Sequence, residues 1–261
     1  RVVLTTGASS GIGWAAALAF ARAGYDVCAF ARRADRLKAL RAEIENLPAS
    51  HGGLLPVVGD VRNGQELTDA VERVMARFGR LDILVANAGV GQQGAVADAD
   101  WDDLQTVLQT NIDGVMHSVR AAVPAMRAGS GGHILIISSV VAGLHTPYTA
   151  TYAASKAFVS SLAGSLRLEL ADDNIAVTDV LVGRTVTEFN QNRLGSRQAN
   201  RGGLPTKTAD DVAAALVKAA ERKPRHLILS LFDRLILAGG VFAPGIMARL
   251  ARRQYQPRGS D

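Results

Sequence analysis

The sequence is poor in cysteine and has no long uninterrupted hydrophobic run. Its 261 residues include one cysteine, Cys28, so no disulfide can form within the chain, and its apolar surroundings predict a buried thiol in a reducing compartment. The best candidate for a membrane span, residues 227–250, is interrupted by Asp233, Arg234 and Pro244, so we do not expect it to cross a bilayer. The chain begins with a strand-like segment that runs into a glycine turn, so we expect no signal peptide and a cytoplasmic protein.

The net charge of +5 lies in the C-terminal part of the chain. Residues 222–261 carry eight basic and two acidic side chains, whereas residues 1–221 have a net charge of −1. A nucleic-acid-binding surface needs basic residues interleaved with aromatic residues across the fold, and the sequence lacks this pattern. None of the five histidines is spaced with Cys, Asp or Glu as metal ligands are. We therefore predict no nucleic-acid partner and no metal site.

Short apolar runs alternate with longer amphipathic segments through residues 1–230. The runs predict strands at residues 2–5, 26–30, 54–58, 81–86, 133–138, 175–182 and 226–230. Because these runs are almost continuously apolar, both faces of each strand should be buried, as in a parallel sheet with helices on both sides. The sequence therefore predicts an α/β fold, a doubly wound, Rossmann-like parallel sheet in a single domain.

Two segments depart from this alternation. Residues 188–205, rich in Asn, Gln, Gly and Arg, predict a long loop in the substrate region. Residues 231–261 predict an apolar and basic C-terminal helical extension, broken at residues 239–240 and 243–245, with a short helix over residues 246–253. This extension could cover the substrate pocket, form a subunit interface or lie on an anionic membrane surface. We favour the first two roles because the helix is short.

A glycine-rich turn directly follows the first predicted strand. It reads Thr6-Gly7-Ala8-Ser9-Ser10-Gly11-Ile12-Gly13 and leads into an alanine-rich helical segment. Glycines let the backbone turn tightly and approach a pyrophosphate, which binds where a helix begins and its N–H groups are free. We therefore expect a dinucleotide to bind at Gly7, Ser9, Ser10, Gly11, Ile12 and Gly13.

The second predicted strand ends at Ala31-Arg32-Arg33, where an NAD-binding protein would place an acidic residue against the ribose 2′-hydroxyl. A planar guanidinium suits a 2′-phosphate, so NADP(H) is favoured over NAD(H). Arg32 is the first candidate for this contact and Arg33 the second, and Ser10 could add a hydroxyl group. Alternatively, both arginines are solvated residues before a helix.

Tyr152 and Lys156 form the pair with the clearest chemical meaning. On a helix the two side chains lie one turn apart on the same face, and no other tyrosine has a lysine four positions on. A nearby ammonium favours the phenolate and moves the pKa of the tyrosine towards neutral pH, where it can act as an acid or base. A solvated helix face is the alternative.

Taken together, these motifs resemble the short-chain dehydrogenase/reductase family, classical type, over residues 1 to about 230. The residues that carry the resemblance are Thr6-Gly7-x-x-x-Gly11-x-Gly13, Asp60-Val61, Asn87-Ala88-Gly89, Asn111, Ser139 and Tyr152-x-x-x-Lys156. The resemblance implies an NADP(H)-preferring oxidoreductase that interconverts a carbonyl compound and an alcohol, as a homodimer or homotetramer.

The resemblance also implies a role for each residue. Tyr152 would be the general acid/base, and Lys156 would lower its pKa and bind the nicotinamide ribose. Ser139 would hydrogen-bond the substrate oxygen, and Asn111 would anchor a water in a proton relay. Contacts to the adenine are implied for Asp60 and Val61.

Local patterns give independent reasons for some of these roles. Ser139 follows a predicted strand at its carboxyl end, where ligands bind in open α/β sheets, and strand alternation points its neighbour Ser138 to the opposite face. Asn111 is a poor helix former in a helical pattern, which indicates a hydrogen-bonding role unless it is idle on the surface. The Asn87-Ala88-Gly89 motif follows another strand and either contacts the cofactor or braces the glycine turn.

One segment departs from the family pattern Pro-Gly-x-Val-x-Thr. This chain reads Val182-Gly183-Arg184-Thr185-Val186-Thr187, so the fixed φ of the proline is lost and a polar residue replaces an aliphatic one. We expect cofactor contacts at Gly183, Thr185 and Thr187 and leave the nicotinamide geometry open. Arg184 is a specificity element for an acidic substrate or a surface arginine.

Two histidines have an alternative role as well. His145 lies between Ser139 and Tyr152 and either reaches the substrate or is an ordinary loop residue. His117 falls in the same helical pattern as Asn111, where packing or a subunit contact is expected.

The function predicted from the sequence is an NADP(H)-dependent oxidoreductase for a hydrophobic ketone, aldehyde or alcohol. The alternatives are a non-catalytic NADP(H) sensor or scaffold and a protein associated with a membrane surface.

Overall fold

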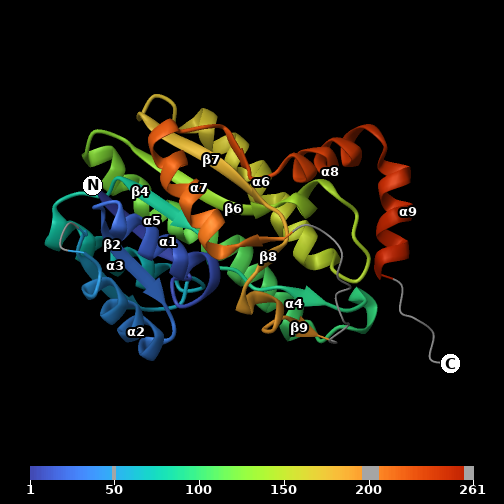
Figure 1. The fold of residues 1–261 in the computed structure, drawn as a ribbon, viewed down its shortest axis with the longest axis horizontal. Helices are drawn as coiled ribbons and strands as arrows, with labels where there is room; N and C mark the ends of the chain where they lie inside the picture. Colours follow the sequence, from blue (N-terminus) through green and yellow to red (C-terminus); the bar gives the residue numbers. More distant parts are fainter. Residues whose placement is uncertain (49–50, 196–205, 256–261) are drawn as a thin grey trace.

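The computed structural model describes residues 1–48, 51–195 and 206–255, and these contain a seven-stranded sheet (Figure 1). Its strands are β1 (Val2–Thr6), β2 (Asp26–Ala31), β3 (Leu54–Val58), β4 (Ile83–Ala86), β6 (Gly132–Ser139), β7 (Ile175–Val182) and β11 (His226–Ile228). All are parallel, in the order β11-β7-β6-β4-β1-β2-β3, and all seven predicted strands are confirmed. The chain reverses its direction of winding between β1 and β4, which opens a crevice at the carboxyl ends of these strands.

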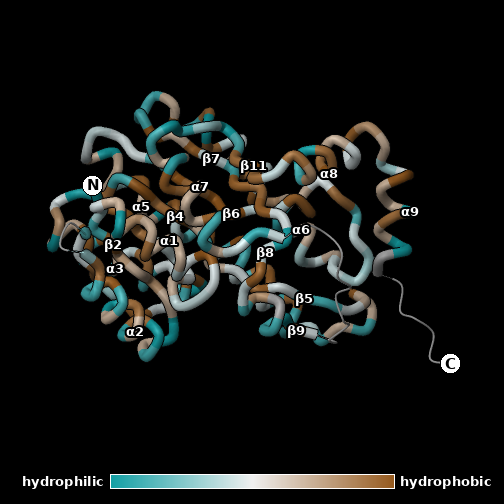
Figure 2. Tube along the Cα trace, in the orientation of Figure 1, coloured by the Kyte–Doolittle hydropathy of each residue, from teal (hydrophilic) through white to brown (hydrophobic). Residues whose placement is uncertain are grey.

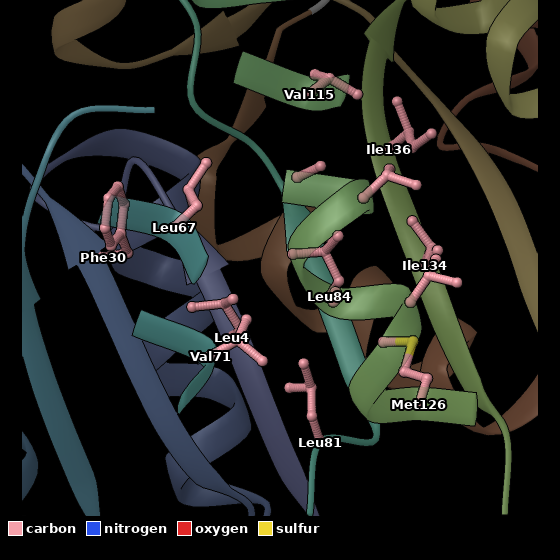
Figure 3. Packing of buried hydrophobic residues seen from close by; sticks show 14 of the residues in the cluster. Leu4, Phe30, Leu67, Val71, Leu81, Leu84, Val115, Met126, Ile134 and Ile136 are labelled. Atoms are coloured by element: carbon pink, nitrogen blue, oxygen red, sulfur yellow. The ribbon is translucent and has the colours of Figure 1, made fainter. Parts of the chain in front are cut away.

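Helices cover both faces of the sheet, as the doubly wound prediction requires. One face carries α1 (Gly11–Arg22), α2 (Ala34–Glu45) and α7 (Ala209–Arg222), and the other carries α3 (Gly64–Phe78), α5 (Gly114–Ala128) and α6 (Ala150–Glu169). Adjacent strand residues divide between the two cores: Val3 packs under α1 and α7, and Leu4 packs on the α3 side. Figure 3 shows the second core, where Ile134 of β6 lies beside Met126 of α5 and Ile136 lies towards Val115.

Short elements surround the crevice. In the chain, η3 (Val140–Gly143) directly follows β6, and β8 (Thr185–Val186) and η4 (Glu188–Asn190) follow β7. Two small parallel pairs tie the loops together: β5 (Gln92–Gln93) with β9 (Leu194–Gly195), and β8 with β10 (Lys207–Thr208). The loop predicted at residues 188–205 therefore contains η4 and β9, and its residues 196–205 lie outside the described residues.

The helix predicted around Asn111 contains a wider turn. Between α4 (Trp101–Leu108) and α5 lies the π-helical turn η2 (Gln109–Asp113). Such turns interrupt the regular α-helical hydrogen bonds and are frequent at functional sites. Here the turn presents the Asn111 side chain to the loop after β4.

The C-terminal arm consists of α8 (Leu231–Phe242) and α9 (Pro244–Tyr255), so the break predicted at residues 243–245 is confirmed at Ala243 alone. The break predicted at Gly239 and Gly240 is wrong, because α8 continues through both. These glycines allow close packing instead: a Cβ on Gly240 would lie 2.3 Å from the carbonyl oxygen of Gly143, so the helix approaches η3 closely. The short helix also begins two residues earlier than predicted.

The arm projects at one end of the molecule, and Figure 2 shows hydrophobic residues along both helices. Among the described residues, no single helix has the length and apolar character needed to cross a membrane. Helices α8 and α9 meet those criteria only together, and they are bent by 118° relative to each other.

Candidate active site

The glycine turn is held against the loop after β4. Gly7 and Gly11 have φ of 67° and 53°, in the left-handed region that glycine adopts without strain. The hydroxyl of Thr6 accepts hydrogen bonds from the backbone N–H groups of Asn87 and Ala88, each at 3.1 Å. The side-chain amide of Asn87 donates to the carbonyl of Thr6 at 2.9 Å. Of the two roles open for the Asn87-Ala88-Gly89 motif, the structure shows the bracing of this turn.

The turn leads into a helix start that fits a phosphate. Ser10 is the N-cap of α1, its side chain makes no capping hydrogen bond, and the first turn contains no acidic residue. Ser10 and the first two residues of the helix, Gly11 and Ile12, line a cavity of about 1060 Å³ that extends from the glycine turn past Tyr152 to the C-terminal arm. Free N–H groups at a helix start favour an anion, so this end of the cavity suits the pyrophosphate of a dinucleotide.

Most predicted cofactor residues share this cavity. Its walls include Gly7, Ser9, Ser10, Gly11, Ile12, Arg32, Arg33, Asp60, Val61, Asn87, Ala88, Gly89, Tyr152, Lys156, Gly183, Thr185 and Thr187. Gly13 does not line it, because it lies behind the turn, where a Cβ would come 2.3 Å from the carbonyl oxygen of Gly7. Gly13 therefore allows the close packing of the turn itself.

Three of the four predicted catalytic residues also line the cavity, at the carboxyl end of β6. Ser139 ends that strand, and its hydroxyl donates to the carbonyl of Val182 at 3.0 Å. Tyr152 and Lys156 lie on α6, with the Lys156 Nζ 5.9 Å from the centre of the Tyr152 ring. The Lys156 Nζ donates to the carbonyl of Ile137 at 2.8 Å. The phenol and the ammonium thus share one wall of the cavity, as their spacing predicted.

Lys156 is 4% exposed and has one acidic group acting on it. Burial lowers the pKa of its ammonium to about 8, and the negative charge of Asp179 opposes this shift. Asp179 is itself buried in β7, where it accepts hydrogen bonds from the hydroxyls of Ser138 and Ser160. Sequence reasoning missed Asp179, although an acidic residue inside an apolar predicted strand was a visible signal.

Asn111 is fully buried and does not line the cavity. Its side-chain oxygen accepts from the backbone N–H of Val90 at 2.8 Å, and its amide donates to the carbonyl of Val90 and the hydroxyl of Ser155, both at 3.0 Å. An idle surface position is thereby excluded. A Cβ on Gly89 would lie 3.2 Å from the Asn111 oxygen and 3.5 Å from the Lys156 Nζ, so both side chains lie close to this glycine.

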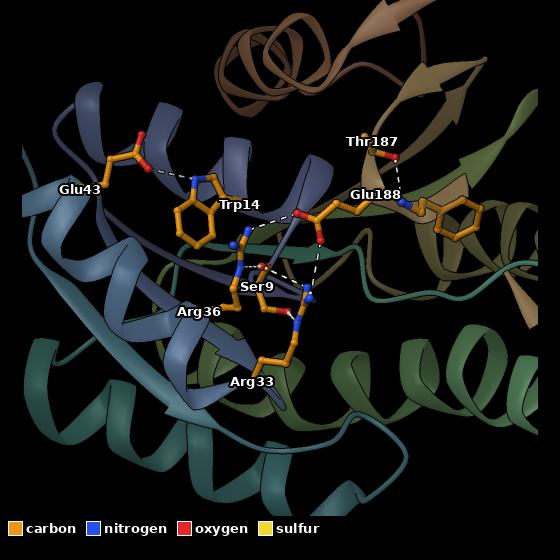
Figure 4. A network of polar contacts seen from close by, with 8 residues as sticks. Ser9, Trp14, Arg33, Arg36, Glu43, Thr187 and Glu188 are labelled. Atoms are coloured by element: carbon orange, nitrogen blue, oxygen red, sulfur yellow. Dashed lines mark hydrogen bonds and ion pairs between the residues drawn. The ribbon is translucent and has the colours of Figure 1, made fainter. Parts of the chain in front are cut away.

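The two arginines after β2 point to different partners. Arg32 forms an ion pair with Asp60 at 3.8 Å. Arg33 turns over the glycine turn, where its guanidinium donates to the hydroxyl of Ser9 at 3.2 Å and to the Ser9 carbonyl at 3.1 Å (Figure 4). The sequence ranked Arg32 first, and both arginines line the cavity. Arg36, which the sequence did not single out, reaches the same carbonyl of Ser9 at 3.2 Å.

Beyond Tyr152 the cavity is bounded mainly by apolar side chains. Phe189 of η4 packs near the Tyr152 ring, with 5.6 Å between ring centres. Further walls come from Val140, Val141, Leu144, Phe232, Leu235, Ile236, Met247 and Leu250. His145 and Arg184 lie on these walls too, whereas His117 is held away from them by a 3.0 Å contact between its Nδ1 and the carbonyl of Val61. One surface of the arm therefore covers this end of the cavity.

A buried carboxylate interrupts the apolar walls. Asp233, 7% exposed, lies in the first turn of α8 and accepts a hydrogen bond from the Ser230 hydroxyl at 2.6 Å. It explains the glycine after β7, because a Cβ on Gly183 would lie 2.3 Å from the Asp233 carboxylate. The sequence pointed to Asp233 only as an interruption of an apolar run.

Comparisons with known proteins agree with this arrangement. A family model described as short chain dehydrogenase matches residues 1–198. Sulfoacetaldehyde reductase 2 of Chromohalobacter salexigens is 35% identical over 232 residues, which cover 87% of this chain and 90% of that protein. Glycine betaine reductase ATRR of Emericella nidulans is 34% identical over 88% of this chain, but the match spans only 18% of that longer protein.

Solved structures share the fold as well. An alcohol dehydrogenase from Thermococcus sibiricus, complexed with 5-hydroxy-NADP, is 25% identical with a TM-score of 0.76, covering 89% of this chain and 97% of that one. A short chain dehydrogenase from Mycobacterium paratuberculosis, bound to NAD, is 27% identical with a TM-score of 0.76, covering 87% and 95%. The fold, the site geometry and the match over residues 1–198 lead to one conclusion: the chain belongs to the short-chain dehydrogenase/reductase family of oxidoreductases.

Proposed function

We propose that this protein is an NADP(H)-dependent oxidoreductase that interconverts a hydrophobic ketone or aldehyde and the corresponding alcohol. The observation that carries the proposal is the shared wall of Ser139, Tyr152 and Lys156 in a cavity that also reaches the glycine turn. A hydroxyl, a phenol and a buried ammonium at the carboxyl end of a parallel sheet are the groups that proton transfer to a carbonyl oxygen requires.

Each residue has a defined task in the reduction. The nicotinamide supplies hydride chemistry when it is bound. Tyr152 donates a proton to the carbonyl oxygen, and the Ser139 hydroxyl donates a hydrogen bond to the same oxygen as its negative charge develops. The Lys156 ammonium favours the phenolate that remains on Tyr152. Asn111, which like Lys156 lies close to Gly89, anchors a water that returns the proton.

NADP(H) is the proposed cofactor because two arginines, and no acidic residue, follow β2 and line the cavity. The two solved relatives described above hold an NADP derivative and NAD, so the choice rests on this chain's own residues. Arg32→Asp should weaken NADPH binding at least ten-fold more than NADH binding, since it replaces a partner of the 2′-phosphate by a repelling charge. Calorimetric titration measures both, and equal losses would refute the assignment.

The substrate is proposed to be hydrophobic because the walls beyond Tyr152 are mostly apolar. In this proposal, residues 1–230 carry the cofactor and catalytic sites, and residues 231–261 form an extension that covers the substrate end. Deletion of residues 231–261 should raise the KM for a hydrophobic ketone while cofactor affinity stays the same. If the deletion also lowered cofactor affinity, the extension would be required for the folding of the whole domain and not only for substrate binding.

Tyr152→Phe is the decisive variant for the enzyme proposal. Removing the phenolic hydroxyl removes the proton donor, so we expect kcat with NADPH and a panel of hydrophobic ketones to fall by about 10²- to 10⁴-fold. NADPH affinity and the thermal midpoint should stay close to those of the wild type. A non-catalytic NADP(H) sensor or scaffold is the alternative, and it would be supported if both proteins bound NADPH and neither turned over any substrate.

Contact of the outward surface of the C-terminal arm with an anionic membrane is a second, alternative proposal for this arm. Leu231, Val241, Phe242 and Ile246 are exposed and lie outside the cavity walls, and Phe242 is 86% exposed. Residues 234–255 contain four arginines and no acidic residue, so two copies of this surface repel each other whereas anionic lipid attracts it.

Vesicle flotation tests the membrane contact. Binding to anionic vesicles should be lost in a Phe242→Ser, Ile246→Ser double variant and kept in Leu168→Ser, which changes an exposed leucine on α6. Absence of flotation for the wild type would leave the arm as a pocket cover or a subunit interface.

A homodimer or homotetramer is proposed as well, because α4 and α6 also have exposed large side chains, Trp101 and Leu168. Light scattering measures the oligomeric state.

A further inference from the structure

The carboxylate of Glu188 lies between the guanidinium groups of Arg33 and Arg36 (Figure 4), and Arg33 lines the cofactor cavity. The two carboxylate oxygens are 3.6 Å from the Nη1 of Arg33 and 3.2 Å from the Nη2 of Arg36. Both arginines also donate to the carbonyl of Ser9. The glycine turn, the start of α2 and η4 therefore meet at this one carboxylate, and Arg36 and Glu188 are 152 positions apart in the chain.

Two arginines that share one carboxylate form a site with the chemistry of a phosphate site. Guanidinium groups bind carboxylate and phosphate oxygens through the same donors. Arg33 lines the cofactor cavity beside Ser9, so its guanidinium faces both the cavity and Glu188. A single guanidinium in contact with a bound phosphate has fewer donors left for the carboxylate.

We infer that Glu188 competes with the 2′-phosphate of NADP(H) for Arg33 and Arg36. The inference rests on the proposed use of NADP(H) and adds a residue that tunes it. A bound 2′-phosphate draws the two guanidinium groups away from Glu188, whereas NAD(H), which has no such phosphate, leaves the ion pairs in place.

The same competition links the cofactor to the substrate end. Glu188 is followed by Phe189, which packs near the Tyr152 ring, and preceded by Thr187, whose side chain lies against Gly11. Release of Glu188 from its arginines removes the ionic attachment of η4 to α2. The short helix that carries a wall of the substrate region is then less constrained when the phosphate-bearing cofactor is bound.

The size of the effect follows from exposure. The side chains of Arg33, Arg36 and Glu188 are 42%, 39% and 42% exposed, so water screens their ion pairs. Exposed pairs contribute little, and removing the competing carboxylate is expected to tighten binding of a 2′-phosphate by about two- to five-fold. Ligands without this phosphate should bind Glu188→Gln and wild type equally.

The probes are adenosine 2′,5′-bisphosphate and adenosine 5′-monophosphate, titrated by calorimetry into the full chain. Glu188→Gln should bind the bisphosphate two- to five-fold more tightly and the monophosphate unchanged. Glu188→Asp keeps the charge and should behave like the wild type. Glu43→Gln is a matched control, because Glu43 accepts a hydrogen bond from Trp14 next to the arginines without contacting either of them.

Trp14 reports the movement directly. The Arg36 guanidinium lies 4.9 Å from the centre of the Trp14 ring, so its displacement should change the emission of Trp14. The chain has two tryptophans, and Trp101→Phe removes the other one. The bisphosphate should change the emission in this background, and the monophosphate should leave it unchanged.

Three results would overturn the inference. If Glu188→Gln left both affinities unchanged while the wild type still preferred the bisphosphate, the competition would be refuted and the NADP(H) proposal would stand. Equal weakening of both ligands in Glu188→Gln would make the ion pairs a structural brace. A wild type without any preference for the bisphosphate would overturn the cofactor assignment together with the inference.

Discussion

The two ends of the cavity are built from different interactions. At the reacting end, Ser139, Lys156 and Asn111 are at most 8% exposed, and each makes a hydrogen bond with the backbone. At the other end, the side chains of Arg32 and Arg33 are 62% and 42% exposed and form ion pairs with carboxylates. Buried hydrogen bonds are fixed by the fold, whereas exposed ion pairs are weak and exchange with solvent. The chemistry is therefore rigidly positioned, and cofactor selection depends on contacts that can be exchanged.

Gly13→Ala should disrupt the packing of the glycine turn against the loop after β4, on which the cofactor end of the cavity depends. A Cβ at this position would lie 2.3 Å from the carbonyl oxygen of Gly7 and 2.5 Å from the side-chain amide of Asn87. Because one of these atoms belongs to the backbone, the turn must shift, and we expect a loss of about 1–3 kcal/mol of stability and of measurable NADPH binding. Urea unfolding and calorimetric titration measure the two effects.

Gly164→Ala is the matched control for this prediction. Gly164 lies within α6, and a Cβ there would have no neighbour within 4 Å. Alanine in place of a helical glycine should leave stability unchanged or raise it by up to about 1 kcal/mol. If Gly13→Ala behaved like this control, the claim that the turn packs too tightly for a Cβ at Gly13 would be refuted.

Asp179→Asn should alter the pH profile of the reacting end. Asp179 raises the pKa of Lys156 against the lowering effect of burial, which brings it to about 8, so removing the carboxylate lowers that pKa further. The ammonium then loses its proton at lower pH, and the alkaline limb of kcat moves to lower pH. Each pKa unit changes the ratio of protonated to neutral lysine ten-fold, so we expect kcat at about pH 8.5 to fall by about three- to ten-fold.

Ser160→Ala separates charge from packing in this test. It removes one hydrogen bond to Asp179 and keeps the carboxylate, so the alkaline limb should stay where it is in the wild type. A limb that moved equally in both variants would mean that Asp179 acts on Lys156 through local structure and not through its charge.

The fold was predictable because its signal is local. Continuous apolar runs locate all seven strands of the sheet, since both faces of each strand are covered by helices. The glycines of α8 show the limit of such reasoning. Gly239 and Gly240 look like helix breaks in the sequence, but Met247 of α9 and Gly143 of η3 pack against them. Their role depends on neighbours that only the tertiary structure brings close.

The candidate site was predictable where its residues belong to a motif, and unpredictable where they depend on distant partners. Its residues were identified by a known order and spacing, and the structure brings Ser139, Tyr152 and Lys156 to one cavity wall. Asp179 and Glu188 were missed because their partners are distant in sequence: Ser138 is 41 positions from Asp179. An acidic residue acquires its meaning from the cation or hydroxyl that folding places beside it, and no spacing rule connects Glu188 to Arg36.

The smallest expected effect belongs to the exposed end and tests its weakness. Asp60 is partly exposed: burial raises its pKa, but hydrogen bonds and charge from Arg62, with the charge of Arg32, lower it overall. Arg62→Gln should therefore cost less than about 1 kcal/mol of stability at neutral pH. A carboxylate with a lowered folded pKa stabilises the protein above its unfolded pKa, and this contribution is lost as the pH falls through the folded value. In urea unfolding, the free energies of unfolding of wild type and variant should converge in acid and in high salt. A difference above about 2 kcal/mol that persisted under these conditions would mean that the ion pairs at the exposed end are as stable as the buried contacts at the reacting end.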